Sequence, residues 1–212
     1  MKKKIRLGLN IGLAILSVVL LGFGIFNLVT INSKGGSGGP AEVDSLSNAY
    51  FVVGKDPTEY QKENFKLLTK ELENEPRDDA KVAEYVTKAF IIDFYTWSNK
   101  NGAWDVGGTQ YVYNYGMFFS QAVGFYYKDI DMFIAKYGQE NLPTVSNITI
   151  DGCKTIENIE VDGATYPAYA CLANWEYEVK EGFDASKFQT FAEFYVLKQP
   201  DGLMLIYGWL YE

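Results

Sequence analysis

The strongest constraint on the fold is a change in the spacing of apolar residues near Pro143. Before it, apolar residues recur every three or four positions, as they do from Val82 to Phe90, which is the period of an amphipathic helix. After it they alternate, as in Cys171–Lys180, which is the period of a strand. Helices followed by antiparallel strands predict an α+β domain in which helices cover one face of the sheet.

Three helical regions are expected before the sheet. The first covers residues 57 to 73, with Asp56 as its N-cap and Glu59 completing a capping box. The second begins at Asp78 or Asp79 and continues to about Trp97. The third covers residues 116 to 137, broken near residues 128 to 131, and the glycine that follows it predicts its C-cap.

Four strand-like runs follow. The first contains "VSNITID" and the second "CLANWEYEVK". The last two, "SKFQTFAEFYVLK" and "LMLIYGWLYE", flank Gln199-Pro200-Asp201-Gly202, a composition typical of a tight hairpin turn. The runs predict an antiparallel meander.

Cys153 and Cys171 are the two cysteines of the chain. A three-residue hairpin at Val161-Asp162-Gly163 would place them opposite each other, which favours a disulfide. Unbroken alternation, however, turns Cys153 away from the face that carries Cys171. A bulge at Gly152 would reconcile the two patterns, so both the bonded and the free state remain open.

A 25-residue segment without charge, Leu7–Ile31, is long enough to cross a bilayer as a helix. Lys2, Lys3, Lys4 and Arg6 precede it, which predicts a cytoplasmic N-terminus. We expect a cell-membrane protein with a single span, residues 1–31 forming the cytoplasmic tip and signal anchor. The alternative is a cleaved secretion signal. A Gly/Ser-rich tether (residues 32–42) and one extracytoplasmic domain (residues 43–212) would follow.

Charge and composition exclude several functions. All 27 acidic residues lie after residue 40, whereas only 14 of the 19 basic residues do. The domain that follows residue 40 is therefore strongly negative, which makes nucleic acid a poor partner. The chain has no histidine, so Ser-His-Asp triads and histidine-containing metal sites are absent. Phosphate-binding and dinucleotide-binding glycine motifs are also missing. We expect no catalytic, metal or cofactor site.

An acidic residue stands inside the aromatic stretch "FIIDFYTW". At 100° per residue Asp93 falls in the middle of the apolar stripe of its helix. One hypothesis places Asp93 at the bottom of a ligand-binding cone lined by aromatic side chains, namely Tyr95, Trp97, Tyr111 and Tyr113. The alternative, which we favour, makes it a structural anchor that accepts hydrogen bonds from tyrosines or from amides of the "NGAWDVGG" loop.

That loop is a second candidate. Trp104 and Asp105 precede Gly107-Gly108, which permits positive φ and close backbone approach. Trp104 could anchor a partner protein, or it could be a buried indole that fixes the loop. The sequence favours the buried arrangement.

The span, the tether, the leading helices and the terminal hairpin "FAEFYVLKQPDGLMLIYGWLYE" together resemble the nuclear transport factor 2-like superfamily. More narrowly, they resemble the membrane-anchored outer domains of type IV secretion and conjugation assembly factors. The resemblance covers residues 56 to 211 and rests on architecture, because no functional motif of the family is matched residue by residue. It implies a cone-shaped fold and a scaffold role without a catalytic centre.

We therefore expect a membrane-anchored extracytoplasmic interaction module, and the resemblance implies that it is a component of a conjugative or secretion complex. Its partners would be the membrane, other membrane or envelope proteins, and copies of itself. The alternatives are a small-molecule-binding cone and an isomerase or hydrolase that uses Asp93.

Overall fold

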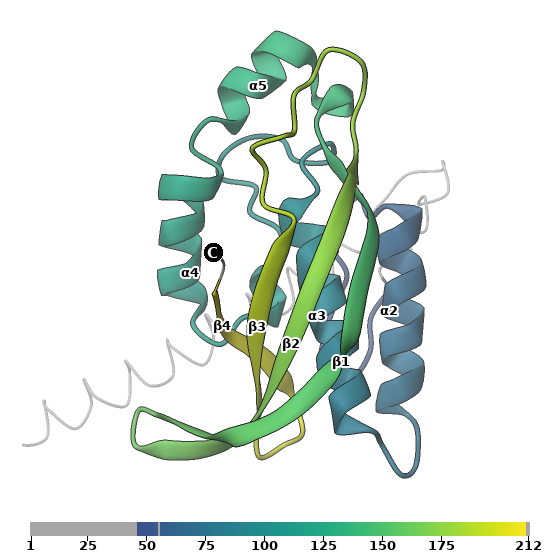
Figure 1. Ribbon diagram of the computed structural model, residues 1–212, viewed down its shortest axis with the longest axis vertical. Coiled ribbons are helices and arrows are strands. Elements are labelled where there is room, and N and C mark those ends of the chain that lie inside the picture. Colours follow the sequence, from purple (N-terminus) through teal and green to yellow (C-terminus); the bar gives the residue numbers. More distant parts are fainter. Residues whose placement is uncertain (1–45, 55, 211–212) are drawn as a thin grey trace, which may run out of the picture. The chain divides into compact units, whose positions relative to one another are not determined.

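A four-stranded antiparallel meander forms the last third of the chain (Figure 1). The computed structural model describes residues 46–54 and 56–210. The strands, in both chain and spatial order, are β1 (Thr144–Val161), β2 (Ala164–Glu178), β3 (Phe191–Lys198) and β4 (Met204–Leu210). The predicted α+β class and the meander are confirmed.

The two long helices lie close to their predicted positions. α2 covers Glu59–Leu72 and α3 covers Asp79–Tyr95. Asp78 caps α3 by accepting hydrogen bonds from two backbone amides. The predicted cap of α2 is wrong, because Thr58 and not Asp56 performs this role. Thr58 Oγ1 accepts the amide of Gln61 at 3.2 Å.

The third helical region is interrupted, as predicted. α4 (Tyr115–Gln121) passes into a π-helical turn, η2 (Ala122–Tyr126), and α5 (Ile130–Tyr137) follows. Gly138 ends α5 with a φ of 82°. The π turn inserts extra backbone into the helix, so the aromatic run 125–127 presents its rings in several directions. One ring, that of Tyr127, is buried, while that of Phe125 is exposed.

An aromatic core lies between α3, α4 and the sheet. The ring of Phe90 lies 5.7 Å from that of Phe118, 5.8 Å from that of Phe194 and 5.2 Å from that of Trp209, measured between centroids. Phe94 stacks on Phe90 at 5.2 Å. One face of α3 therefore holds α4 against β3 and β4.

The β1–β2 hairpin carries the two cysteines. Cys153 pairs with Cys171 in the register and forms a disulfide with it, a sequence separation of 18. The register shifts between Ile150 and Cys153, where Gly152 has a φ of 69°, so an extra residue turns Cys153 to the face of Cys171. The turn is shorter than predicted, because Val161 pairs directly with Ala164 across two residues of positive φ.

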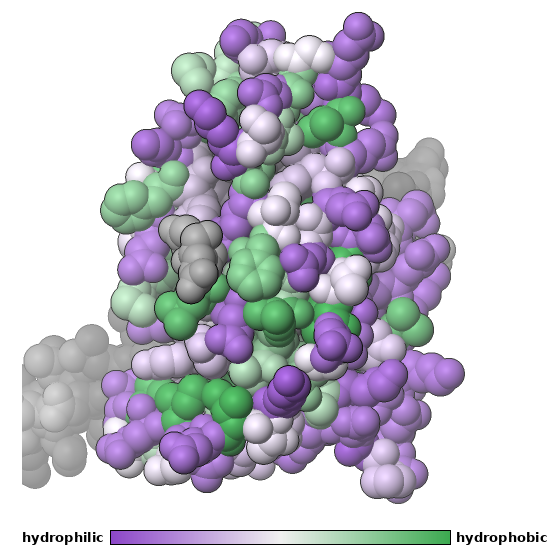
Figure 2. Space-filling model, viewed as in Figure 1, coloured by the Kyte–Doolittle hydropathy of each residue, from purple (hydrophilic) through white to green (hydrophobic). Residues whose placement is uncertain are grey.

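The outer face of the sheet is turned away from α3. Figure 2 looks onto this face and shows apolar residues scattered among hydrophilic ones. Leu172, Glu193 and Leu210 form one row across three strands through their register. The start of β3 differs from the prediction, since residues 186–190 precede the strand as turn and loop.

The predicted membrane span, Leu7–Ile31, and the tether lie outside the described residues. Within residues 46–54 and 56–210, no helix combines the length and the apolar character that a bilayer crossing requires.

Candidate functional site

Asp93 lies at the centre of a buried polar network. Its Oδ1 receives a hydrogen bond from Lys100 Nζ at 3.1 Å, and both residues are only 4% exposed. Its Oδ2 accepts the amide of Gly108 at 2.9 Å and Nε2 of Gln110 at 3.1 Å. The carboxylate thus joins the end of α3 to the following loop and to η1 (Thr109–Tyr111).

The protonation of Asp93 follows from two opposed effects. Burial, the largest influence, raises the pKa of the carboxyl. The Lys100 ammonium and the hydrogen bonds from Gly108, Lys100 and Gln110 outweigh it, so the pKa of Asp93 lies below its ordinary value. Asp93 is therefore a buried carboxylate whose charge is matched by a buried cation.

Two glycines allow the loop to approach Asp93 this closely. A Cβ at Gly107 would overlap the backbone carbonyl of Asp93, and one at Gly108 would stand 2.8 Å from the ring of Phe90. Gly108 also has a φ of 74°, which glycine adopts without strain. The close approach explains why glycines occupy both positions.

The four aromatic residues expected to line one cavity with Asp93 lie in different places. Tyr95 and Trp97 line a cavity whose lining does not include Asp93. The ring of Tyr111 is buried against Phe51, and that of Tyr113 lies near Tyr166 and Tyr207. The helical period correctly predicts that Asp93 faces inward, but the side chains that meet it come from the loop rather than from the aromatic positions.

The loop residues divide between two roles. Gly107 and Gly108 lie against α3, as described. Asp105 Oδ2 accepts the backbone and side-chain amides of Asn101, each at 2.9 Å, and closes the turn. Trp104 is 68% exposed, so the buried indole that the sequence favours is wrong. Aromatic character alone does not show that a side chain lies inside the core.

A cavity of about 310 Å³, here called the Trp97 cavity, opens between the end of α3, the π turn and the segment before β3. It is predominantly aromatic. Its rings are those of Phe94, Tyr95, Trp97, Phe125, Tyr126, Phe133 and Phe188. Its polar lining residues are Asp129, Lys187 and Gln189. The combination is typical of a small-molecule site, in which a few polar groups orient a largely apolar ligand.

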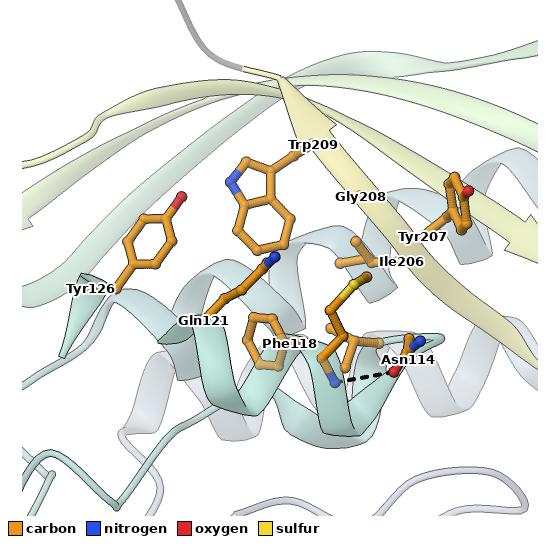
Figure 3. A pocket seen from close by; sticks show the side chains of 10 residues that line it. Asn114, Phe118, Gln121, Tyr126, Ile206, Tyr207, Gly208 and Trp209 are labelled. Atoms are coloured by element: carbon orange, nitrogen blue, oxygen red, sulfur yellow. Dashed lines mark hydrogen bonds between the residues drawn. The ribbon is translucent and has the colours of Figure 1, made fainter. Parts of the chain in front are cut away.

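A second cavity, of about 270 Å³, lies on the other side of Tyr126 and is called the Trp209 cavity (Figure 3). The indole of Trp209 points from β4 toward the helix below it, where Phe118 and Gln121 face it. Asn114 lies at the far end, its Oδ1 accepting the amide of Met117 at 3.1 Å. The cavity therefore combines an apolar lining with amide side chains.

The Trp209 cavity borders the outer edge of β4, because Gly208 and Trp209 line it. β4 is the last strand of the sheet. In the part of the chain that the structure describes, its outer edge is met only by Val112–Tyr113, through one bridge at Ile206 and a 2.8 Å bond from the Tyr113 amide. The later half of β4 is thus an open sheet edge beside a cavity.

Several residues of these sites were not anticipated. Lys100 stands in a polar turn and looks like an exposed residue, because the sequence does not show that the loop folds back over α3. In the sequence, Tyr126 and Trp209 stand out only as members of aromatic runs, which do not indicate that either residue lines a cavity. Among the described residues, no group of three or more acidic or cysteine side chains is arranged to hold a metal ion.

Comparison with protein-family models, with curated proteins and with solved structures finds no match to this chain. The candidate sites therefore rest on their own geometry.

Proposed function

We propose that this protein is a membrane-anchored extracytoplasmic interaction module that binds an extended segment of a partner protein along the outer edge of β4. An apolar side chain of that segment would enter the Trp209 cavity. The observation that carries the proposal is the open edge of β4 directly beside this cavity.

The strand edge supplies the backbone part of such binding. Gly208, Trp209 and Leu210 lie beyond the bridge at Ile206, and a partner strand would pair with those of their amides and carbonyls that point away from β3. Strand addition of this kind takes affinity from main-chain hydrogen bonds and specificity from pockets for alternate side chains.

The cavity supplies the side-chain part. Phe118, Trp209 and Ile206 offer apolar contacts, and Met117 at the rim is 56% exposed. The amide of Gln121 lies beside the indole and can bond to the backbone of an incoming segment (Figure 3). An apolar anchor in such a pocket is the usual arrangement of a binding hot spot.

The expected span and tether determine the setting of the proposed interaction. A domain held near the membrane by a flexible linker meets other membrane-bound proteins at a high effective concentration. The partners we propose are therefore other membrane or envelope proteins, including copies of this chain. A place in a conjugative or secretion complex follows only from the architectural resemblance to assembly factors of those systems.

We propose no isomerase or hydrolase role for Asp93. Its two oxygens are engaged by Lys100, Gly108 and Gln110, and it lines neither the Trp97 cavity nor the Trp209 cavity. A small ligand therefore has no access to it from these cavities.

The test uses the full chain in membranes with a photo-crosslinking residue in place of Gln121. We expect an adduct whose crosslinked peptide, sequenced by mass spectrometry, is an extended segment with an apolar residue. The substitution Met117→Glu should abolish this adduct by placing a charge at the cavity rim.

Met132→Glu is the matched control, because Met132 is 57% exposed on α5 and lines neither of the two cavities. It should leave the adduct intact. If Met117→Glu and Met132→Glu have equal effects, or if the captured peptide is a helix without an apolar anchor, docking at the β4 edge is wrong.

A further inference from the structure

The rings that line the Trp97 cavity are inclined to one another rather than parallel. Trp97 is inclined by 70° to Phe188 and by 39° to Phe133, and Phe94 is inclined by 81° to Tyr95 and by 71° to Tyr126. A flat ligand would need parallel walls between which to stack. Inclined rings instead suit a rounded group that contacts several of them at once.

The polar groups of this cavity differ in how much they can offer a ligand. The amide of Gln189 is already used, since its Oε1 accepts the Tyr95 hydroxyl at 3.0 Å and its Nε2 donates to the carbonyl of Phe191 at 2.9 Å. Asp129 and Lys187 are exposed and carry opposite charges. They form no salt bridge with each other within 4.0 Å.

These features favour a particular kind of positive group. A primary ammonium has three N–H donors, and those that face the aromatic walls rather than Asp129 would go unsatisfied, which is costly for a buried donor. A quaternary ammonium has no N–H and is attracted to aromatic rings through the cation–π interaction. Asp129 adds attraction for its charge at the rim of the cavity.

Lys187 determines which second charged group the ligand carries. A pure cation would be repelled by its ammonium, whereas a ligand with a carboxylate on the same small molecule would pair with it. The cavity volume of about 310 Å³ lies at the lower end of the range for small-molecule sites.

We infer that the Trp97 cavity binds a small zwitterion that combines a quaternary ammonium with a carboxylate. The ammonium lies among the rings near Asp129, and the carboxylate lies beside Lys187. This site does not depend on partner docking at the β4 edge, because it lies on the other side of Tyr126 and uses different polar groups.

The test is calorimetric titration of the full chain in maltoside micelles with four small probes. Glycine betaine carries both groups. Choline lacks the carboxylate, glycine lacks the methyl groups, and tert-butylacetate has the same shape as glycine betaine without the positive charge. We expect glycine betaine to bind with a dissociation constant of about 1 mM or tighter and at least about tenfold more tightly than the other three.

Variants at exposed positions keep the fold while they change the site. Phe125 is 73% exposed. The substitution Phe125→Ala removes one ring from the cavity wall and should weaken glycine betaine binding by about two- to fivefold. Asp129→Asn and Lys187→Gln should each weaken it by about threefold. The matched controls on exposed strand positions, Leu172→Ala, Asp151→Asn and Lys154→Gln, should leave binding unchanged.

Three results would overturn the inference. If tert-butylacetate binds as tightly as glycine betaine, the positive charge is not recognised. If glycine binds as tightly, the methyl groups are not recognised. If no binding of glycine betaine is detected at a ligand concentration of about ten times the expected dissociation constant, the cavity does not bind this ligand. None of these results bears on the crosslink at position 121, so the two proposals fail separately.

Discussion

Lys100 Nζ lies 3.1 Å from Asp93 Oδ1, in a position where both side chains are almost completely removed from water. The pair joins the last turn of α3 to the loop that leads into η1. Because each charge is buried, each is stabilised by the other, and Lys100 Nζ also donates to Asn99 Oδ1 at 2.9 Å.

The first prediction concerns this dependence. Asp93→Asn leaves the Lys100 charge buried without its partner, so the free energy of unfolding should fall by about 3–5 kcal/mol. Lys100→Met should also lower the free energy of unfolding. The double variant Asp93→Asn/Lys100→Met should lower it by clearly less than the sum of the two single decreases. Urea unfolding of the four proteins measures the coupling.

A surface pair provides the control. Lys62 and Glu59 lie 2.7 Å apart on α2, but Glu59 is largely exposed. Lys62→Met should change the free energy of unfolding by at most about 1 kcal/mol. Additive losses at Asp93 and Lys100 would mean that the two charges do not stabilise each other.

The second prediction concerns acid. The pKa of Asp93 lies below its ordinary value because Lys100 and the hydrogen bonds from Gly108 and Gln110 outweigh burial. The unfolded chain takes up a proton at this position near pH 4, whereas the folded chain does so only at lower pH. This part of the stability is therefore complete above about pH 4 and is lost as the pH falls through the folded pKa.

Unfolding by urea at a series of pH values below about 5 tests whether the stability that Asp93 contributes is lost as the pH falls. The double variant Asp93→Asn/Lys100→Met has no carboxyl at this site, so its stability should fall less steeply with acid than that of the wild type. Asp151→Asn, an exposed substitution on β1, controls for the loss of a carboxyl that is not buried. Parallel acid profiles for the wild type and the double variant would contradict the prediction.

The third prediction distinguishes two glycines. Gly107→Ala places a Cβ against the carbonyl of Asp93 and 2.7 Å from its Oδ1, so the loop must shift. We expect a loss of about 1–3 kcal/mol in the free energy of unfolding, the usual cost of overpacking. Gly116→Ala is the opposite case, because a Cβ at this position in α4 meets nothing within 4 Å.

Gly116→Ala should stabilise by about 0.5–1 kcal/mol through helix propensity alone. Thermal unfolding of both variants therefore gives changes of opposite sign. Equal changes would show that the close contact of Gly107 with Asp93 does not constrain the loop.

The sequence predicts what local periodicity and capping determine. The change of period near Pro143 predicts the order of helices and strands, the pair Asp78-Asp79 predicts where α3 starts, and the helical wheel predicts that Asp93 faces inward. Each of these depends on residues within a few positions of one another.

Features that depend on tertiary contacts were not predictable in this way. Lys100 pairs with Asp93 because the loop reverses direction, and the open edge beside Trp209 exists because β4 ends the sheet. Asp56 and Thr58 are both good N-cap residues, and only the path of the backbone selects Thr58. Trp104 is exposed because its loop is fixed by Asp105 and the glycines rather than by the indole.

The fourth prediction concerns the disulfide between Cys153 and Cys171. The bond closes a loop whose ends are 18 residues apart, and closing such a loop contributes about 3 kcal/mol in the chain-entropy model. Protein that matures in an oxidising compartment should gain two hydrogens in mass on reduction, and reduction should lower its free energy of unfolding by about that amount. The double variant Cys153→Ala/Cys171→Ala should have the stability of the reduced protein and show no further response to reductant. If the oxidised and reduced wild-type proteins unfold at the same urea concentration although the mass shows the bond, the β1–β2 hairpin is held by its strand pairing alone.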